Sequence, residues 1–333
     1  MLKNVTKKIF AGILAISVLG VTGCTNKASN EGKSETKEPI TIRFGYQPGH
    51  SQIVVAKEKG WLDEEFSKDG ITFQLEKFAS GPPMIEAFAG ERLDFGQVGD
   101  QPAIQAKANN IDLKAIGIYS STEKGNALLA TNESGIKSIA DLKGKKVGVT
   151  IGSVGHQLLY IYLKSAGLTV NDIQQINLSP GDIKTSLSSK NIDAAVTWEP
   201  NISQIVQEGS GSIIADGTGY KLNVNVIIGT SKFLKENPEV TERLLKVLDK
   251  ASKWIKENKQ EALEIVSKDA GVPVAALEPG FEKSNLDIAF TDEAIKSIED
   301  TEVFIKENNI IRTDVDVKEL IDETYLKNAG IEK

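Results

Sequence analysis

The sequence predicts an α/β fold, and three observations support this class. From residue 40 onward, short runs of β-branched and aromatic residues alternate with segments of helical periodicity. Several predicted strands run directly into a loop of small residues and then a helix, which is the order of a parallel-type α/β sheet. About 295 residues follow residue 38, and a chain of that length is sufficient for two lobes.

The first strand–helix units follow each other closely. Residues 40–46 alternate as a strand, Pro48 and Gly49 form a turn, and Ser51 is placed to cap a helix that stops at Gly60. The other strands expected here cover 71–78, 93–98 and 113–119, and the other helices cover 82–89 and 103–109.

A further unit has the same design. Residues 146–150 form a β-branched strand, 151–155 a Gly/Ser loop, and 156–166 a helix that closes at Gly167. The design recurs once more, with a strand at 192–196 and a helix at 201–208. In an open α/β sheet, loops of this kind gather at the carboxyl ends of the strands, where ligands bind.

The last third of the chain is predicted to be helical, over residues 240–257, 261–268, 291–308 and 317–326. The first of these helices carries an apolar stripe at helical spacing, which we assign to core packing rather than to a cofactor site. The stripe consists of Leu244, Leu245, Leu248, Ala251, Ser252 and Ile255.

The N-terminus is predicted to be a targeting segment. Three lysines precede an apolar run at 9–19, which is shorter than the roughly 20 residues that span a bilayer. Gly23 and Cys24 follow, and this order resembles a bacterial lipobox, which implies that residues 1–23 are removed and Cys24 carries lipid. Cys24 is the only cysteine and has no disulfide partner. The alternative is a plain secretory signal with an incidental cysteine.

Residues 24–39 contain almost no apolar side chains and are predicted to be a flexible tether. Removal of residues 1–23, with their three lysines and no acidic residue, changes the formal net charge from −7 to −10. We therefore expect no nucleic-acid partner. Any bound anion must be held by local dipoles or single basic residues.

The loop at 151–155 is the first candidate for such a site. Ser153 could donate its hydroxyl, and Val154, Gly155 and His156 their backbone N–H groups, to an anionic oxygen at the positive end of the helix dipole. The alternative is an ordinary turn between strand and helix.

Several phrases of the chain, in this order, resemble the substrate-binding proteins of aliphatic-sulfonate, taurine and nitrate ABC importers. They are Tyr46-Gln47, Ala79-Ser80-Gly81-Pro82, Leu93-Asp94-Phe95-Gly96, Gly99-Asp100-Gln101-Pro102, Ile139-Ala140-Asp141-Leu142-Lys143-Gly144-Lys145-Lys146-Val147, Gly152-Ser153 and Asp193-Ala194-Ala195-Val196-Thr197-Trp198-Glu199-Pro200. The resemblance covers residues 40–219 closely and the helical third loosely. The Asp141–Val147 phrase marks the wider superfamily, whereas the loops equivalent to 79–82, 99–102 and 198–200 line the cleft in similar proteins.

This resemblance implies the type II periplasmic-binding-protein fold, with two α/β lobes joined by two crossovers. Lobe one would comprise residues 40–126 and 226–333, and lobe two residues 127–225, with further strands at 127–131 and 173–178. The implied role is a receptor that is lipid-anchored on the extracytoplasmic face of the cell membrane. It would capture a small anionic or zwitterionic solute by hinge closure and deliver it to an ABC permease.

The resemblance also implies which residues face the cleft. Gln47, Ser80, Gly81 and Gln101 are candidate polar contacts, and Trp198 is a candidate apolar wall for a ligand tail. Each could instead serve the local fold.

Asp100 and Glu199 are candidates of a different kind, because an acid beside an anion is unfavourable unless the ligand also carries a cation. If one of them faces the cleft, a zwitterion such as taurine fits; if neither does, a plain alkanesulfonate fits. Helix capping is the favoured role for Asp100.

The predicted function is therefore that of a monomeric solute receptor for an organosulfonate, with no cofactor and no metal. Nitrate or bicarbonate, a thiamine-precursor pyrimidine and an aromatic carboxylate remain alternative ligands. An enzyme is disfavoured because the two histidines, His50 and His156, lie about a hundred residues apart and no hydrolase or phosphate-loop motif occurs. A structural surface lipoprotein is disfavoured by the lack of repeats.

Overall fold

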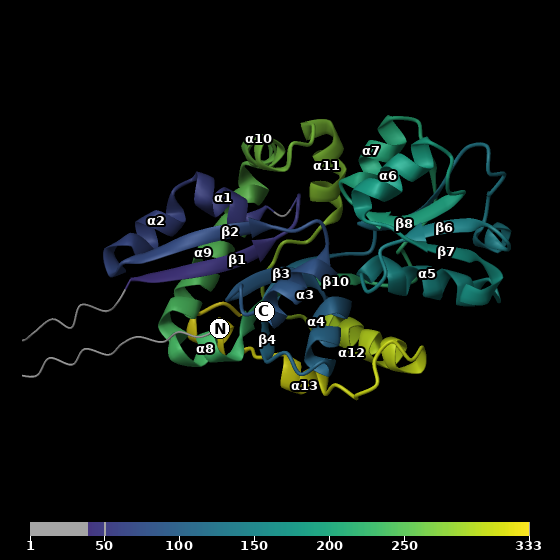
Figure 1. The fold of residues 1–333 in the computed structure, drawn as a ribbon. Coiled ribbons are helices and arrows are strands. Elements are labelled where there is room, and N and C mark those ends of the chain that lie inside the picture. The colour runs from purple at the N-terminus through teal and green to yellow at the C-terminus, as the bar shows by residue number, and fades with distance from the viewer. Residues whose placement is uncertain (1–38, 50, 333) are drawn as a thin grey trace, which may run out of the picture. The chain divides into compact units, whose positions relative to one another are not determined.

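The computed structural model describes residues 39–49 and 51–332, which contain two five-stranded sheets with helices packed around them (Figure 1). The predicted signal segment, Cys24, most of the predicted tether and His50 lie outside the described residues. No helix in the described part of the chain is both long and apolar enough to cross a membrane.

Sheet one has the strand order β2-β1-β3-β10-β4. Its strands are β1 (Ile40–Tyr46), β2 (Ile71–Lys77), β3 (Phe95–Gly99), β4 (Leu113–Thr122) and β10 (Asn223–Thr230). β1 runs parallel to β2 and β3, with Ile40 opposite Ile71 and Phe44 opposite Phe95. β10 runs antiparallel to both β3 and β4.

Sheet two has the strand order β7-β6-β8-β5-β9. Its strands are β5 (Asn126–Ala130), β6 (Lys146–Val149), β7 (Gln174–Asn177), β8 (Ala194–Trp198) and β9 (Ser212–Asp216). β6 is parallel to β7 and β8, whereas β5 is antiparallel to β8 and β9.

The α/β class is confirmed, but both sheets are mixed rather than purely parallel. The antiparallel strands β5 and β10 are the two strands by which the chain crosses from one sheet to the other. Asn126, which begins β5, pairs with Trp198 at the end of β8, and Asn225 of β10 pairs with Gly99 at the end of β3. A strand that enters at the carboxyl ends of its neighbours must run against them, so the crossovers explain the mixed sheets.

The helices fall into three groups along the chain. The N-terminal group is α1 (Gln52–Glu58), α2 (Trp61–Phe66), α3 (Gly81–Ala89) and α4 (Asp100–Ala108). The helices associated with sheet two are α5 (Val154–Ser165), α6 (Pro180–Ser188) and α7 (Asn201–Gln207). The C-terminal group is α8 (Ser231–Glu236), α9 (Pro238–Glu257), α10 (Lys259–Ala270), α11 (Val274–Lys283), α12 (Asp292–Glu307), α13 (Val317–Leu320) and α14 (Thr324–Asn328).

Helix α9 supplies much of the core beside sheet one. The whole predicted stripe is buried, and Leu244, Leu245 and Leu248 are fully inaccessible to solvent. Complete burial of one such leucine contributes about 2 kcal/mol. Trp254 of α9 meets the edge of Trp61 of α2 at a ring-centroid distance of 5.8 Å. The stripe is therefore core, as predicted.

The predicted helix over 317–326 is wrong, because Ile321 interrupts it. Ile321 adopts an extended backbone and forms a parallel bridge with Ala115 of β4. The N–H of Asp322 donates to the carbonyl of Ala115 at 2.9 Å. Pairing with the sheet edge therefore replaces one turn of helix and separates α13 from α14.

Helix α11 was not predicted, because Pro279 and Gly280 in its interior are typical of a turn. Pro279 has no N–H to donate to the carbonyl four residues earlier, that of Ala275. The side chain of Gln207, at the end of α7, donates to that carbonyl instead at 2.9 Å. A donor from the sheet-two side thus completes this helix, which lies between α10 and α7 (Figure 1).

Candidate functional site

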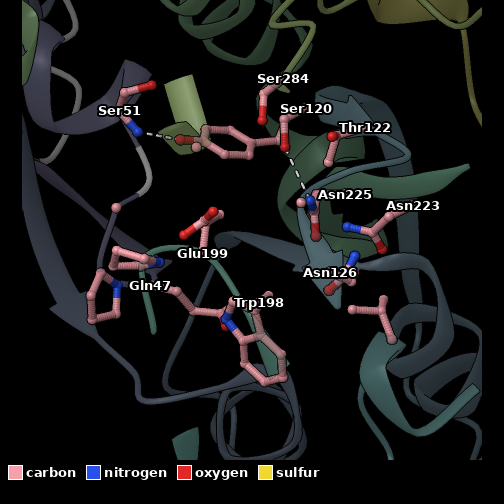
Figure 2. A pocket seen from close by; sticks show the side chains of 18 of the residues that line it. Gln47, Ser51, Ser120, Thr122, Asn126, Trp198, Glu199, Asn223, Asn225 and Ser284 are labelled. Atoms are coloured by element: carbon pink, nitrogen blue, oxygen red, sulfur yellow. Dashed lines mark hydrogen bonds between the residues drawn. The ribbon is translucent and has the colours of Figure 1, made fainter. Parts of the chain in front are cut away.

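A pocket lies where the carboxyl ends of the parallel strands of the two sheets face each other (Figure 2). It encloses about 880 Å³ of empty space, including solvent at its mouth. The crossover strands and helix α11 also contribute to its wall. Its polar lining side chains are Gln47, Ser51, Tyr119, Ser120, Thr122, Asn126, Ser153, Glu199, Asn223, Asn225 and Ser284.

The start of helix α5 lies against helices α3 and α4. A Cβ placed on Gly99, the N-cap of α4, would lie 2.5 Å from Cγ1 of Val154, the first residue of α5. A Cβ on Gly152 would lie 3.4 Å from Pro82 of α3, and Gly152 also has a φ of +82°, which favours glycine. The N-termini of α3, α4 and α5 therefore converge at the pocket, where Gly81, Gly99 and Val154 line the wall, and the positive ends of their dipoles lie there.

Gly81 and Val154 line this part of the pocket, together with Ser153. The Ser153 hydroxyl, which we expected to serve a ligand, donates to the carbonyl of Thr150 at 2.7 Å. Its proton is therefore engaged in the loop, although the oxygen can still accept. Gly155 follows Val154 in the first turn of α5 but does not line the pocket. The backbone N–H of His156, which we also expected to serve a ligand, donates to the carbonyl of Ser153 at 3.0 Å. The N–H groups of Val154 and Gly155 therefore remain as the available donors of α5.

His156 lies behind the pocket wall and does not line it. Its ring packs edge-on against Tyr160 at a centroid distance of 4.9 Å, and only 4% of the residue is exposed. Burial lowers the pKa of His156 to about 4, so the imidazole is neutral at pH 7 and adds no positive charge to the site.

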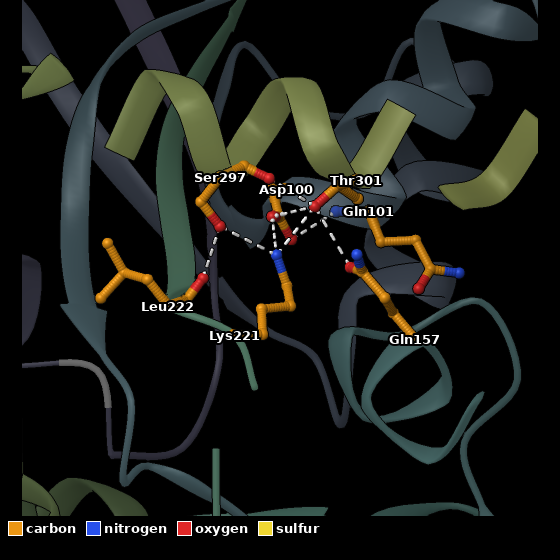
Figure 3. A network of polar contacts seen from close by, with 7 residues as sticks. All are labelled: Asp100, Gln101, Gln157, Lys221, Leu222, Ser297 and Thr301. Atoms are coloured by element: carbon orange, nitrogen blue, oxygen red, sulfur yellow. Dashed lines mark hydrogen bonds and ion pairs between the residues drawn. The ribbon is translucent and has the colours of Figure 1, made fainter. Parts of the chain in front are cut away.

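Asp100 does not face the pocket, because it is buried in a network of polar contacts (Figure 3). Its Oδ2 lies 2.7 Å from Nζ of Lys221, and the Thr301 hydroxyl donates to the same oxygen at 2.7 Å. Its Oδ1 accepts the N–H of Gln101 at 2.8 Å, next to the start of α4. Gln157 of α5 joins the network through Thr301 at 3.1 Å.

Glu199 does line the pocket, and its charge is balanced. One carboxylate oxygen lies 2.8 Å from Nζ of Lys283, the last residue of α11. The other oxygen accepts the N–H of Ser203 at 3.1 Å. Among the described lining residues Glu199 is the only charged one, so the pocket carries no net charge once Lys283 is counted.

The remaining predicted contacts divide between wall and interior. Gln47 lines the pocket, and Nε2 donates to the carbonyl of Gln97 at 3.4 Å. Trp198 is half-buried and lines the pocket beside an apolar group. That group consists of Pro48, Pro200, Leu277, Phe281 and Leu286. Ser80, the N-cap of α3, and Gln101 are buried but do not line the pocket.

The polar side chains of the crossover strands were not predicted from the sequence. Asn126 at the start of β5 and Asn223 at the start of β10 line the pocket, and each has a buried side-chain oxygen without a hydrogen-bond partner. Asn225 donates to the Ser120 hydroxyl at 3.0 Å (Figure 2). The signal that could have identified them was their position, since the predicted lobe boundaries fell beside 126 and 225.

A tyrosine was missed as well. The phenol oxygen of Tyr119, on β4, accepts the backbone N–H of Ser51 at the pocket wall. Burial raises the pKa of Tyr119, so this phenol stays protonated at neutral pH.

The chemistry of the wall is that of a binding site. It offers helix dipoles, amides and hydroxyls to a charged head and an apolar surface to a tail. No cluster of three or more potential metal ligands occurs within residues 39–49 and 51–332.

Comparison with known proteins gives consistent matches. A model of the NMT1-like family matches residues 33–268. The putative aliphatic sulfonates-binding protein of Bacillus subtilis is 33% identical over 95% of both chains. The taurine-binding periplasmic protein of Escherichia coli is 25% identical over 81% of this chain and 87% of its own.

Solved structures with the same fold include receptors and an enzyme. The alkanesulfonate-binding protein of Xanthomonas axonopodis pv. citri, bound to MOPS, matches with a TM-score of 0.80 and 25% identity, over 86% of this chain and 99% of that one. The desulfurization enzyme DSZB matches with a TM-score of 0.69 and 17% identity, over 87% and 98%. The latter likeness concerns the fold alone.

Proposed function

Because the chain belongs to the NMT1-like family, we propose that it is the solute-binding receptor of an ABC importer and that its solute is an organosulfonate. The observation that carries this proposal is the convergence of three helix N-termini on a pocket without net charge. A sulfonate head has three oxygens that accept hydrogen bonds, and helix N-termini bind such groups without a full positive charge. The names of the relatives point to the same ligand class.

The mechanism that we propose is capture by closure. The lobes would correspond to residues 40–126 with 226–333, and to 127–225, and they would hinge at the crossovers between β4 and β5 and between β9 and β10. Ligand contacts from both lobes exist only in the closed form, so binding shifts the equilibrium toward closure. The closed receptor then docks on a membrane permease.

The ligand contacts proposed from the lining residues are Gln47, Gly81, Ser153, Val154, Trp198 and Glu199, to which we add Asn126 and Asn223. The head would meet the N–H groups of α5, and Trp198 would cover the tail. For Ser80, Asp100, Gln101, Gly155 and His156 we propose supporting roles, because they do not line the pocket.

The receptor is proposed to act as a monomer that is held at the extracytoplasmic face of the membrane by lipid on Cys24. A non-enzymatic role is supported by the state of the reactive groups at the pocket. The Ser153 hydroxyl donates within its own loop, and both oxygens of Glu199 have partners.

The test is isothermal calorimetry with a ligand panel on the purified protein. The panel contains alkanesulfonates, taurine, nitrate, bicarbonate, a thiamine-precursor pyrimidine and aromatic carboxylates. We expect saturable binding of at least one sulfonate with one site per chain. Binding of another panel member without any sulfonate would overturn the ligand assignment, and turnover of a panel member would overturn the receptor role.

A further inference from the structure

The ion pair between Glu199 and Lys283 occupies the place where a ligand cation would bind. The carboxylate of Glu199 is the only acidic group among the described lining residues. Its side chain is 9% exposed, and both of its oxygens are engaged, by Lys283 at 2.8 Å and by the N–H of Ser203 at 3.1 Å. The other acid near these loops, Asp100, is fully buried and paired with Lys221.

Lys283 is held at this position by the packing of α11. A Cβ on Gly280 would lie 3.1 Å from Cβ of Glu199, so the helix backbone is in direct contact with the acid's side chain. Gln207 fixes the same helix to α7 through the carbonyl of Ala275 at 2.9 Å. The lysine therefore sits at the end of a helix that is anchored beside Glu199.

This arrangement has a different consequence for the two kinds of sulfonate. A ligand ammonium removed from water is stabilised most strongly by a carboxylate, and at this pocket the carboxylate of Glu199 is already paired with Lys283. A second cation beside Lys283 would also be repelled. An alkyl group in the same place needs no polar partner and can pack on the apolar part of the wall.

We propose that Lys283 is a specificity-determining residue, which neutralises Glu199 and thereby makes the pocket select sulfonates with uncharged tails over aminosulfonates. The inference rests on the proposed function, because it names the substrate class of the same site. According to this inference, Lys283, which does not itself line the pocket, determines which of the two classes of sulfonate binds.

The test uses two ligands of matched size, 1-propanesulfonate and taurine, in which a methyl group replaces an ammonium group. Calorimetry on the wild type is expected to show tighter binding of 1-propanesulfonate. In Lys283→Met, Glu199 is left unpaired, and the ratio of the two dissociation constants should shift toward taurine by about tenfold or more. If this variant does not fold, Lys283→Gln gives the same test.

The double variant Glu199→Gln/Lys283→Met separates specificity from structure. Without the carboxylate the ratio should return close to the wild-type value, whereas a shift caused by disturbed packing of α11 would persist. The matched control is Lys184→Met, because Lys184 forms a comparable pair with Glu208 at 3.1 Å. The side chain of Lys184 is 30% exposed and that of Lys283 is 27% exposed. The control should keep the wild-type ratio.

Three results would overturn the inference alone: an unchanged ratio in Lys283→Met, a wild type that prefers taurine, or a shift that persists in the double variant. A wild type that binds neither these two nor any other sulfonate would instead overturn the proposed function, and the inference with it.

Discussion

The titratable residues around the pocket are held either in pairs or without charge. Glu199 pairs with Lys283 and Asp100 with Lys221, and burial lowers the pKa of His156 to about 4. The pocket therefore presents dipoles rather than net charge. Such a site suits a ligand with one anionic head, because no fixed charge of the protein has to be compensated by the ligand.

His156 makes stability depend on pH. Its pKa is about 4 in the folded state and about 6.5 in an unfolded chain, so the unfolded state takes up the proton first as the pH falls. We therefore expect the free energy of unfolding to be unaffected by His156 above pH 7 and to decrease between about pH 6.5 and 4. Between pH 7.5 and 5 this residue should account for a loss of about 2 kcal/mol.

The measurement is urea unfolding of wild type and His156→Gln at both pH values. The difference between the two proteins cancels the contributions of all other titrating groups, including His50. An identical pH dependence in the two proteins would contradict the prediction.

At the scale of elements, the site depends on how closely the N-termini of α3, α4 and α5 approach one another. The N-terminus of α5 can approach that of α4 only because Gly99 has no side chain. The β-branched Val154 has little rotamer freedom with which to yield. The absence of a methyl group at Gly99 thus allows α4, which follows a strand of sheet one, to contact α5, which follows a strand of sheet two.

We expect Gly99→Ala to weaken binding of the ligand identified by the panel by about tenfold or more, because the new Cβ would hold α4 and α5 apart. The fold should persist, since Gly99 has an ordinary φ of −65°. The readouts are calorimetric affinity and thermal melting.

Gly99→Ala/Val154→Ala removes the clashing Cγ1 and should recover most of the affinity. Gly181→Ala is the matched control, because a Cβ there would meet nothing within 4 Å. A Gly99→Ala protein with wild-type affinity would show that this close approach does not matter for binding.

The elements that could be predicted from the sequence are those with a strong local pattern. The strands β1 and β6 and the buried stripe of α9 lie close to their predicted positions, because alternation and helical periodicity are properties of neighbouring residues. Helix α11 could not be predicted, since Pro279 leaves the carbonyl of Ala275 without its helical donor and the donor that replaces it, Gln207, is 68 residues away from Ala275. The antiparallel direction of β10 likewise follows from the crossover and from no local pattern.

At the scale of the whole described chain, distant segments meet in the network around Asp100. Helix α4, helix α5, the crossover before β10 and helix α12 all contribute to it through Asp100, Gln157, Lys221 and Thr301 (Figure 3). Asp100 and Lys221 are 121 residues apart. The position of Asp100 near a helix start is visible in the sequence, but its partner Lys221 is not, because the pairing depends on the fold. Asp100 was therefore predicted as a ligand contact.

Removal of one partner from this buried pair should be strongly destabilising, because the other charge is left without compensation. The side chain of Lys221 is 6% exposed and that of Asp100 is 0% exposed. For Lys221→Met we therefore expect a loss of about 3–5 kcal/mol in the free energy of unfolding. Urea unfolding at pH 7 measures it.

Asp100→Asn/Lys221→Met, which removes both charges, should recover part of that loss. Lys190→Met provides the comparison, since Lys190 and Glu133 form an exposed pair at 2.7 Å whose loss should leave the midpoint nearly unchanged. Equal effects of Lys221→Met and Lys190→Met would contradict the prediction.

The hydrogen bond from Gln207 to Ala275 bears on how easily the proposed receptor can release what it has captured. Because Ala275 is exposed, water can take over the carbonyl of Ala275 as soon as α7 and α11 separate, at little cost in free energy. The proline in α11 thus creates an acceptor that a protein donor satisfies in one arrangement and solvent in the other. In the proposed closure, an exchangeable contact of this kind would return α11 to the same position beside α7 without slowing the separation of the two helices.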